Sequence, residues 1–246
     1  MRGLLKSELV YPDLWTPCDF ACCPSVDFSL GTTLTDFSPF RKTGTLSGDW
    51  TVSNGKKALT FGSASTKVVD FGQAVPAKYS TSSTFSVSVW LSPVPSGVIQ
   101  NIVGCRDNIT YGWTLRQNSG QIGILTTGGT SSTYSGSVLA FGVWQHVCLQ
   151  YNIGAIQIFL NGVSVASATG HTITASPNLY IGNIGVTGSQ NCSGLIDDIR
   201  ITPKLLTPSE ISILKLRRGI AYETKRTPGR KTAITITRRK FAWGGF

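Results

Sequence analysis

The sequence predicts an all-β protein in which two antiparallel sheets pack as a sandwich, with one short C-terminal helix, an extended N-terminal arm and a basic C-terminal tail. From residue 45 to 202, short runs of β-forming residues are separated at close intervals by Gly, Ser, Asn and Pro, and no helical periodicity comes between them. The 246 residues are enough for a single core of this kind. We assign residues 1–30 to the arm, 31–216 to the sandwich and 217–246 to the tail.

The arm contains Pro12, Pro17 and Pro24, which interrupt any helix or central strand. Its apolar side chains, among them Tyr11 and Trp15, are too numerous for a free linker. We therefore expect the arm to pack on its own domain or on a neighbour. No run approaches about 18 consecutive apolar residues, and the first residues lack the apolar segment of a secretory signal, so we expect neither a membrane span nor export.

The strands of the sandwich are predicted from alternating apolar and polar residues. The clearest alternation runs from Thr84 to Leu91 and is typical of a half-buried antiparallel strand. Asn161-Gly162 between two apolar runs predicts a hairpin, because a type I′ turn needs two residues that accept positive φ. The predicted strands are 58–62, 66–71, 84–91, 100–104, 112–117, 121–126, 144–152, 156–160, 163–169, 178–184 and 194–201.

A capping box predicts the start of the single helix. Thr207 can accept a hydrogen bond from the third helical amide, Pro208 suits the first helical position, and Glu210 can reach back to the cap. Apolar residues follow on one side, and Gly219 is placed to end the helix in the left-handed conformation.

The positive charge is concentrated in the tail. Nine basic residues and one acidic residue lie between 217 and 246, so +8 of the net charge of +10 is found there. Apolar residues are interleaved with these charges, and the alternation from 232 to 238 predicts an added strand. This pattern favours contact with other protein subunits over contact with nucleic acid or solvated disorder. The residues expected to make these contacts are Arg217, Arg218, Arg226, Arg230, Arg238, Arg239, Phe241 and Trp243.

Seven segments occur in a characteristic order: Phe85-Ser-Val-Ser-Val-Trp-Leu, Gly112-Trp113 to Arg116, Trp144-Gln-His-Val, Phe159-Leu-Asn-Gly, Leu179-Tyr-Ile-Gly, Gly194-Leu-Ile-Asp-Asp-Ile-Arg-Ile and Leu206-Thr-Pro-Ser-Glu-Ile. Together they resemble a laminin-G-like domain of the concanavalin A-like lectin/glucanase kind, over about residues 28–216. The resemblance implies a jelly-roll sandwich of two curved antiparallel sheets. It also implies that Trp144 and Val147 pack between the sheets, and that Asp198 with Arg200 ties the last strand to its neighbours.

A second resemblance concerns the tail. The segment Arg217-Arg218-Gly219-Ile220-Ala221-Tyr222-Glu223, followed by basic residues, is similar to the ends of tailed-bacteriophage proteins that carry this lectin-like module. It implies a non-enzymatic structural protein of the virion, either a capsid decoration or a tail-associated component. Such a protein would assemble with other virion proteins or with copies of itself. The alternative is a glycan-binding adhesin or lectin that recognises host or surface polysaccharide.

Catalytic residues are not expected. Glycoside hydrolysis needs two carboxylates about 5–10 Å apart in one cleft, but the three glutamates of the chain lie outside the predicted strands. Asp197 and Asp198 are adjacent on a strand, so their side chains should point to opposite faces. We expect His146 to be a hydrogen-bonded strand histidine and His171 to be a surface residue in a loop.

No cofactor is expected either. Asp107 and Asn108 lie in a predicted loop, but two residues fall short of the six to eight ligands that Ca²⁺ prefers, and an Asx turn explains them as well. The spacing of Cys18, Cys22 and Cys23 is unusual for zinc ligands. We expect the six cysteines of the chain to be buried free thiols.

A sugar-binding site would use aromatic rings and amide side chains near the ends of strands. The candidates for the rings are Tyr111, Trp113 and Tyr134, and the candidates for the amides are Asn118 and Asn191. The same residues would serve equally well at the edge of a core, and the sequence leaves both alternatives open.

Overall fold

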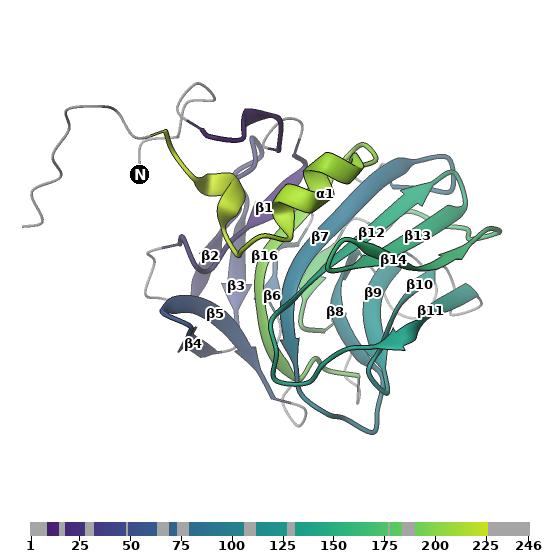
Figure 1. Cartoon of the computed structure of the whole chain (residues 1–246), viewed down its shortest axis with the longest axis horizontal. Helices are drawn as coiled ribbons and strands as arrows, with labels where there is room; N and C mark the ends of the chain where they lie inside the picture. The colour runs from purple at the N-terminus through teal and green to yellow at the C-terminus, as the bar shows by residue number, and fades with distance from the viewer. Residues whose placement is uncertain are drawn as a thin grey trace, which may run out of the picture.

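The computed structural model describes residues 9–14, 18–27, 32–47, 49–62, 69–72, 79–105, 112–126, 131–176, 178–183 and 190–225. In these parts of the chain the strands β1 to β16 form two eight-stranded sheets, and every pair of neighbouring strands is antiparallel (Figure 1). The two sheets pack face to face. The predicted all-β sandwich is therefore confirmed.

The first sheet contains, in spatial order, β14 (Val163–Ala168), β13 (Ala155–Leu160), β12 (Gln145–Asn152), β7 (Thr84–Pro93), β16 (Gly194–Thr202), β5 (Lys56–Phe61) and β4 (Asp49–Ser53), and β1 (Phe20–Cys22) also pairs with β16. The second sheet contains β11 (Ser131–Val138), β10 (Gln121–Thr126), β9 (Trp113–Asn118), β8 (Gln100–Cys105), β15 (Leu179–Ile181), β6 (Val69–Asp70), β3 (Thr43–Leu46) and β2 (Thr33–Thr35).

The core lies between the sheets, because alternate residues of each strand face inward. Phe85, Val87 and Val89 of β7 belong to one buried cluster with Trp113 and Leu115 of β9. The ring centroids of Phe85 and Trp113 are 5.3 Å apart. Burial of such large side chains is the main source of stability for a domain of this kind.

Local signals in the sequence place several elements correctly. Asn161 and Gly162, with φ of 50° and 80°, turn the hairpin between β13 and β14, as the Asn-Gly pair predicts. The strands β1 to β4 and β11 were not predicted. They are short or, in β11, rich in Ser and Gly, so their sequences carry little β signal, and pairing with neighbouring strands stabilises them instead.

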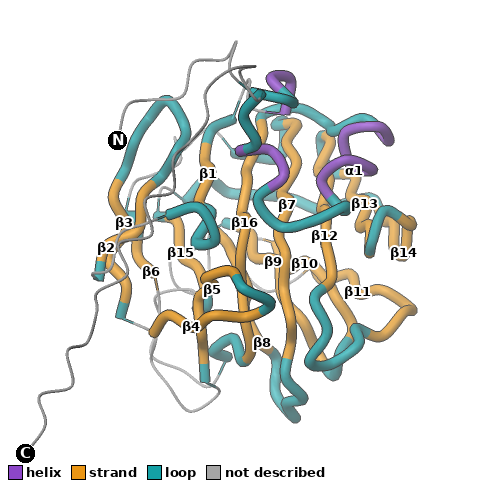
Figure 2. The backbone as a smooth tube through the Cα atoms, turned by 60° about the vertical axis from the view of Figure 1, so that its left-hand side comes forward, coloured by secondary structure: helices purple, strands orange, loops and turns teal. Residues whose placement is uncertain are grey.

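The outer face of the first sheet is covered by α1 (Pro208–Leu214) and by the 3-10 turns η2 (Pro12–Leu14) and η3 (Ile220–Tyr222). In Figure 1, α1 and η3 lie over one end of β16, β7 and β12, and Figure 2 shows the same arrangement from another side. The capping box at Thr207 and Glu210 is present as predicted. The helix ends earlier than predicted, at Leu214, and the left-handed Gly219 (φ 75°) begins η3 instead.

The terminal parts of the described chain pack on this covered face rather than extending away from it. Leu9 forms a β-bridge with Thr224, and the amide of Val10 donates to the carbonyl of Glu223. Ile220 is 2% exposed. Residues 217–225 of the predicted tail therefore pack on the sandwich, and the boundary between residues 216 and 217 stays a prediction. The arm packs on its own domain, which was one of its two expected positions.

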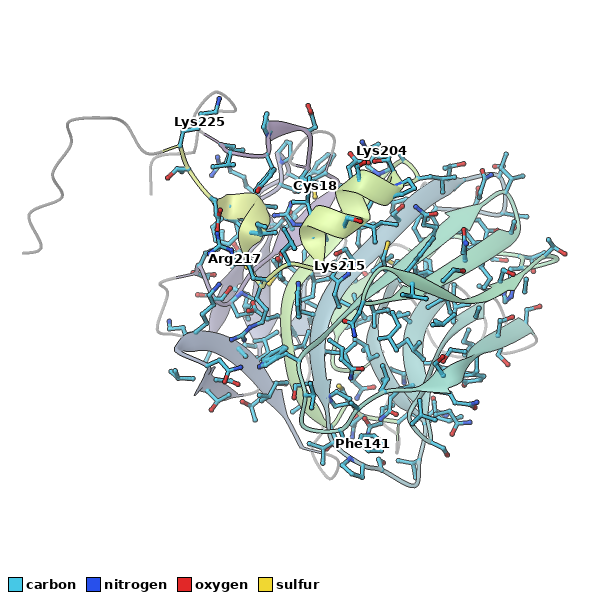
Figure 3. The ribbon with its side chains drawn as sticks, viewed as in Figure 1. Cys18, Phe141, Lys204, Lys215, Arg217 and Lys225 are labelled. Carbon is cyan, nitrogen blue, oxygen red and sulfur yellow. The ribbon has the colours of Figure 1, made fainter. Side chains whose placement is uncertain are left out.

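The two ends of the sandwich differ in character. Figure 3 shows Lys204, Arg217 and Lys225 near α1 and η3, and Phe141 at the opposite end of the molecule.

Among the described residues, no helix is long and apolar enough to cross a membrane.

Candidate functional site

A cross-strand row of side chains occupies the outer face of the second sheet. Asn101 on β8 pairs with Arg116 on β9, Arg116 pairs with Gly123 on β10, and Gly123 pairs with Tyr134 on β11. Residues directly opposite one another in neighbouring strands share a face of the sheet, so these four positions form a line. Thr114 lies two residues from Arg116 on the same face. We call the outer surface formed by Asn101, Thr114, Arg116 and Tyr134 the Arg116 face.

Glycine shapes the Arg116 face. A Cβ atom on Gly123 would lie 2.4 Å from Cδ1 of Tyr134, so only glycine at this position allows the tyrosine ring to lie across the strand. The ring thereby reaches Arg116, whose Cζ atom is 5.2 Å from the ring centroid, within the range of a cation–π contact. The missing side chain at Gly123 therefore brings the arginine and the tyrosine together.

Within the described residues, several buried polar atoms of the Arg116 face have no hydrogen-bond partner of good geometry. They include Oδ1 of Asn101, Oγ1 of Thr114 and Nε of Arg116, while the Tyr134 hydroxyl interacts with the Arg116 guanidinium. Asn101 and Thr114 are 0% exposed, whereas Tyr134 is only half-buried. Most buried polar groups in proteins are paired, so a cluster of unpaired donors and acceptors on one face calls for a functional explanation.

Burial controls the protonation of this face. It lowers the pKa of the Arg116 guanidinium and raises the pKa of the Tyr134 phenol. The guanidinium stays positively charged at neutral pH, because an arginine pKa starts above 12, and the phenol stays neutral. The Arg116 face thus combines one cation with a neutral phenol at the half-buried Tyr134, above the buried polar groups of Asn101 and Thr114.

The predicted sugar-binding residues do not come together. Tyr134 lies on the Arg116 face, but Trp113 is 1% exposed and its ring is in the core, so it is not available to a sugar at the surface. Tyr111 lies outside the described residues. Asn191 is 5% exposed and accepts a hydrogen bond from Asn183, while Asn118 is half-buried at the end of β9. Sequence reasoning missed Arg116, although its two-residue spacing from Thr114 shows that they share a face.

The outer face of the first sheet carries a different group of charges, which we call the Arg200 cluster: Asp197, Asp198, Arg200 and Arg218. Nε of Arg200 lies 3.2 Å from Oδ1 of Asp198, and Nη1 of Arg218 lies 3.3 Å from Oδ2 of Asp197. The Arg200 guanidinium also donates to the carbonyl of Leu14. The role implied for Asp198 and Arg200, tying the last strand to its neighbours, is confirmed.

The prediction that Asp197 and Asp198 point to opposite faces is wrong. A β-bulge interrupts the pairing of β16 with β7 between Asp197 and Arg200, and Asp198 has φ of 46°. The bulge adds one residue, so both carboxylates lie on the outer side of the sheet while Ile196 and Ile199 both face the core. With exposures of 0% and 1%, and with arginine partners, the two aspartates do not form an open catalytic cleft.

The predicted assembly residues that the structure describes, Arg217 and Arg218, differ in burial and in their contacts. Arg218 lies 3.9 Å over the Trp144 ring and pairs with Asp197, so it has partners within the domain. Arg217 is exposed and pairs with Glu223. Trp144 is not between the sheets, because its indole nitrogen donates to Ser53 on the outer side. Val147 does belong to the core between the sheets, as implied. The residues outside the described part of the chain are Arg226, Arg230, Arg238, Arg239, Phe241 and Trp243.

The histidines and cysteines are structural. Nε2 of His146 lies 2.8 Å from the Ser88 hydroxyl, as expected of a hydrogen-bonded strand histidine. His171 was expected at the surface but is 3% exposed and bonds Thr126 and Thr133, which belong to adjacent strands. The six cysteines are buried and free, as predicted. Asp107 and Asn108 lie outside the described residues, and within the described residues no three His, Cys, Asp or Glu side chains are grouped as metal ligands.

A shallow depression of about 300 Å³ lies on the outer side of β12, β13 and β14. Its amide side chains are already engaged: Gln150 donates to the carbonyl of Leu206, Asn152 accepts from Thr84, and Gln157 donates to Ser164. The depression therefore offers a ligand fewer open polar groups than the Arg116 face does.

The family model for the concanavalin A-like lectin/glucanase superfamily matches residues 63–212, which is more than half of the chain. The chain belongs to this superfamily. The lectin-like resemblance predicted from the seven sequence segments is thereby confirmed, and the sheets described above are those of its jelly-roll fold.

Three solved structures have this lectin/glucanase fold in common with the chain. The binding domain of botulinum neurotoxin serotype G matches with a TM-score of 0.61 at 17% identity, over 80% of this chain and 50% of the other. The binding domain of Paraclostridial Mosquitocidal Protein 1 matches with a TM-score of 0.62 at 15% identity, over 86% and 52%. This chain thus spans about half the length of each binding domain.

The third structure is domain 4 of AbnA, an extracellular arabinanase from Geobacillus stearothermophilus, in complex with arabinotriose. It matches with a TM-score of 0.54 at 21% identity, over 70% of this chain and 87% of that domain. At these identities the likeness establishes the common fold, and the ligands of the other proteins belong to them.

Proposed function

We propose that this chain is a non-catalytic glycan-binding domain and that its ligand contacts the Arg116 face. The observation that carries the proposal is the row from Asn101 through Arg116 to Tyr134, which holds unpaired hydrogen-bonding atoms beside an aromatic ring on one sheet face. Sugars offer many hydroxyl groups to such donors and acceptors, and their C–H faces stack on aromatic rings. The lectin-like fold and the arabinotriose complex of AbnA domain 4 support this function.

Tyr134→Ala tests the proposal. Loss of the ring removes the stacking surface and the contact with Arg116, so binding to a glycan found in an array screen should weaken by at least tenfold. Phe40→Ala is the matched control, because Phe40 is 47% exposed beyond the opposite edge strands of the same sheet. Binding would be measured by isothermal titration calorimetry, and thermal unfolding would confirm that both variants are folded.

Equal binding by wild type and Tyr134→Ala would contradict the assignment of the Arg116 face. Release of reducing sugar from a polysaccharide panel would contradict the non-catalytic part of the proposal.

We further propose that the chain acts as a structural component of a virion and that its terminal segments contact other subunits. The basic, aromatic composition of residues 226–246 and the resemblance of residues 217–223 to phage proteins support this second function. Residues 1–8 and 226–246 also join the domain at one place, next to the bridge between Leu9 and Thr224.

Removal of residues 226–246 tests the virion proposal, because it leaves the packed residues 217–225 intact. The full-length protein should sediment with particles at fixed stoichiometry in a density gradient after nuclease treatment, and the truncated protein should remain at the top. Co-sedimentation of the truncated protein, or a full-length protein that stays at the top, would contradict this proposal and leave the glycan-binding one untouched.

A further inference from the structure

Arg116 is a buried cation without an anionic partner. Its side chain lies on an outer sheet face at 7% exposure, its Nε atom has no hydrogen-bond partner, and among the described residues it forms no ion pair with a carboxylate. Its Cζ atom lies 5.2 Å from the centroid of the Tyr134 ring. Burial of an unpaired charge is unfavourable, so buried arginines in proteins are normally paired with a carboxylate or another acceptor.

The same molecule shows how its other buried arginines are accommodated. Arg200 and Arg218, at 2% and 6% exposure, each stack on an aromatic ring as Arg116 does, but each also pairs with an aspartate. The stack on an aromatic ring is common to all three arginines. What distinguishes Arg116 is the absence of a carboxylate among its described neighbours.

We propose that the anion missing at Arg116 is supplied by the ligand, so that the Arg116 face recognises an acidic glycan, one that carries carboxylate or sulfate groups. This inference rests on the proposed glycan-binding function and names the class of its ligand. The guanidinium binds an oxyanion through two parallel N–H donors. A hydroxyl or amide group of a neutral sugar is a weaker partner, because it carries no negative charge. Tyr134, the half-buried member of the face, then contacts the neighbouring sugar.

The proposal requires a movement of Tyr134, because Arg116 is only 7% exposed. The tyrosine is half-buried and lies across Gly123, so rotation of its ring away from the strand opens the guanidinium to an anion. In the bound state the ring stacks on the sugar instead of on the cation. Tyr134 therefore contacts the ligand, and Arg116 selects its charge.

The experiment measures binding of the full-length protein to two matched pairs of probes at physiological salt. The first pair is short oligogalacturonates and their methyl esters, which differ only in the charge of the carboxylate. The second pair is sulfated galactan oligosaccharides and their desulfated forms, which distinguishes a sulfate ligand from a carboxylate ligand. Arg116→Met removes the cation, and Arg217→Met removes an exposed cation on the other side of the molecule as the control.

The proposal requires that the wild type prefers the charged member of at least one pair. Arg116→Met should weaken that binding by about tenfold to a hundredfold, the range of a charge-assisted hydrogen bond, and should change the affinity for the neutral member by less than about threefold. Arg217→Met should bind like the wild type. Arg116→Lys should retain part of the preference, because it keeps the charge without the paired donors.

Three outcomes would overturn the inference. Binding that is equal for charged and neutral members, with neutral glycans still bound through Tyr134, overturns the acidic class and leaves the proposed function standing. An equal loss in Arg116→Met and Arg217→Met shows unspecific attraction by a basic protein. If no glycan binds to the folded wild type in the array screen or to either pair of probes, the proposed function fails as well.

Discussion

Both outer faces of the sandwich carry buried arginines, but the arginines of the two faces have different interaction partners. On the first sheet, α1, η3 and the arm cover the surface, and Arg200 meets Asp198, the carbonyl of Leu14 and the Tyr222 ring. On the second sheet no described helix lies over the strands, and Arg116 contacts the Tyr134 ring but no described carboxylate. The difference teaches that the chain supplies carboxylate partners for its buried arginines on the face that its own segments cover. On the other face no described carboxylate pairs with Arg116, and this contrast is the basis of the proposed ligand site.

The largest expected effect concerns the covered face. Arg200→Met would leave the Asp198 carboxylate buried at 1% exposure without its arginine. We expect the unfolding free energy to fall by about 3–5 kcal/mol, measured by urea denaturation. Arg200→Lys should lose less, because it keeps the charge. An unfolding free energy for Arg200→Met within about 1 kcal/mol of wild type would show that the cluster is not a stabilising partner set.

Acid should also act on the covered face. Burial lowers the pKa of His146 from 6.5 to about 3, so between these pH values the unfolded chain takes up a proton that the folded chain does not. Its contribution to stability is fully present above pH 6.5 and decreases as the pH falls, by up to about 1.4 kcal/mol per pH unit. Burial raises the pKa of Asp197 to about 6, which acts in the opposite direction because its folded form takes up a proton first.

The difference between wild type and His146→Gln isolates the histidine. The variant should lose less stability than the wild type between pH 6.5 and 4, as measured by denaturation at each pH. Arg116→Met should follow the wild-type pH dependence, because arginine does not titrate there. Parallel curves for wild type and His146→Gln would contradict the burial of a neutral histidine.

A smaller effect is expected at the start of α1. Thr207→Ala removes the hydroxyl that accepts from the amide of Glu210, and it leaves the helix without one half of its capping box. We expect a loss of about 1 kcal/mol in the unfolding free energy. Thr207→Ser keeps the acceptor and serves as the control. A loss in the serine variant equal to that in the alanine variant would assign the effect to the methyl group.

The smallest effect on stability is expected on the Arg116 face. Arg116→Met replaces an unpaired buried cation by an apolar side chain of similar length, so the unfolding free energy should stay within about 1 kcal/mol of wild type or increase. Differential scanning calorimetry would measure it. A loss of unfolding free energy as large as that of Arg200→Met would contradict this contrast between the two faces. It would show that other groups of the chain stabilise the Arg116 charge.

Local sequence signals predicted much of the fold and little of the site. The Asn161-Gly162 turn, the Thr207 capping box and the alternation in β7 each depend on residues a few positions apart, and all three are present. From the sequence, Trp113 and Tyr134 are equally good candidates for contact with a sugar. Alternation along a strand shows that neighbouring side chains point to opposite faces of the sheet, but it does not show which face is buried. Arg116 carries no signal of its own, because a charged residue on a strand is normally solvated.

The sequence by itself determined the class of the fold and the places where the chain turns or begins a helix, because these depend on short-range backbone preferences. Only the tertiary structure decided which face of each strand is buried and which arginine meets a carboxylate. The bulge at Asp198, the contact of Arg200 with Leu14 and the row from Asn101 to Tyr134 join residues that are distant in the chain or lie on different strands. Their geometry follows from how the sheets pack, which no local pattern specifies.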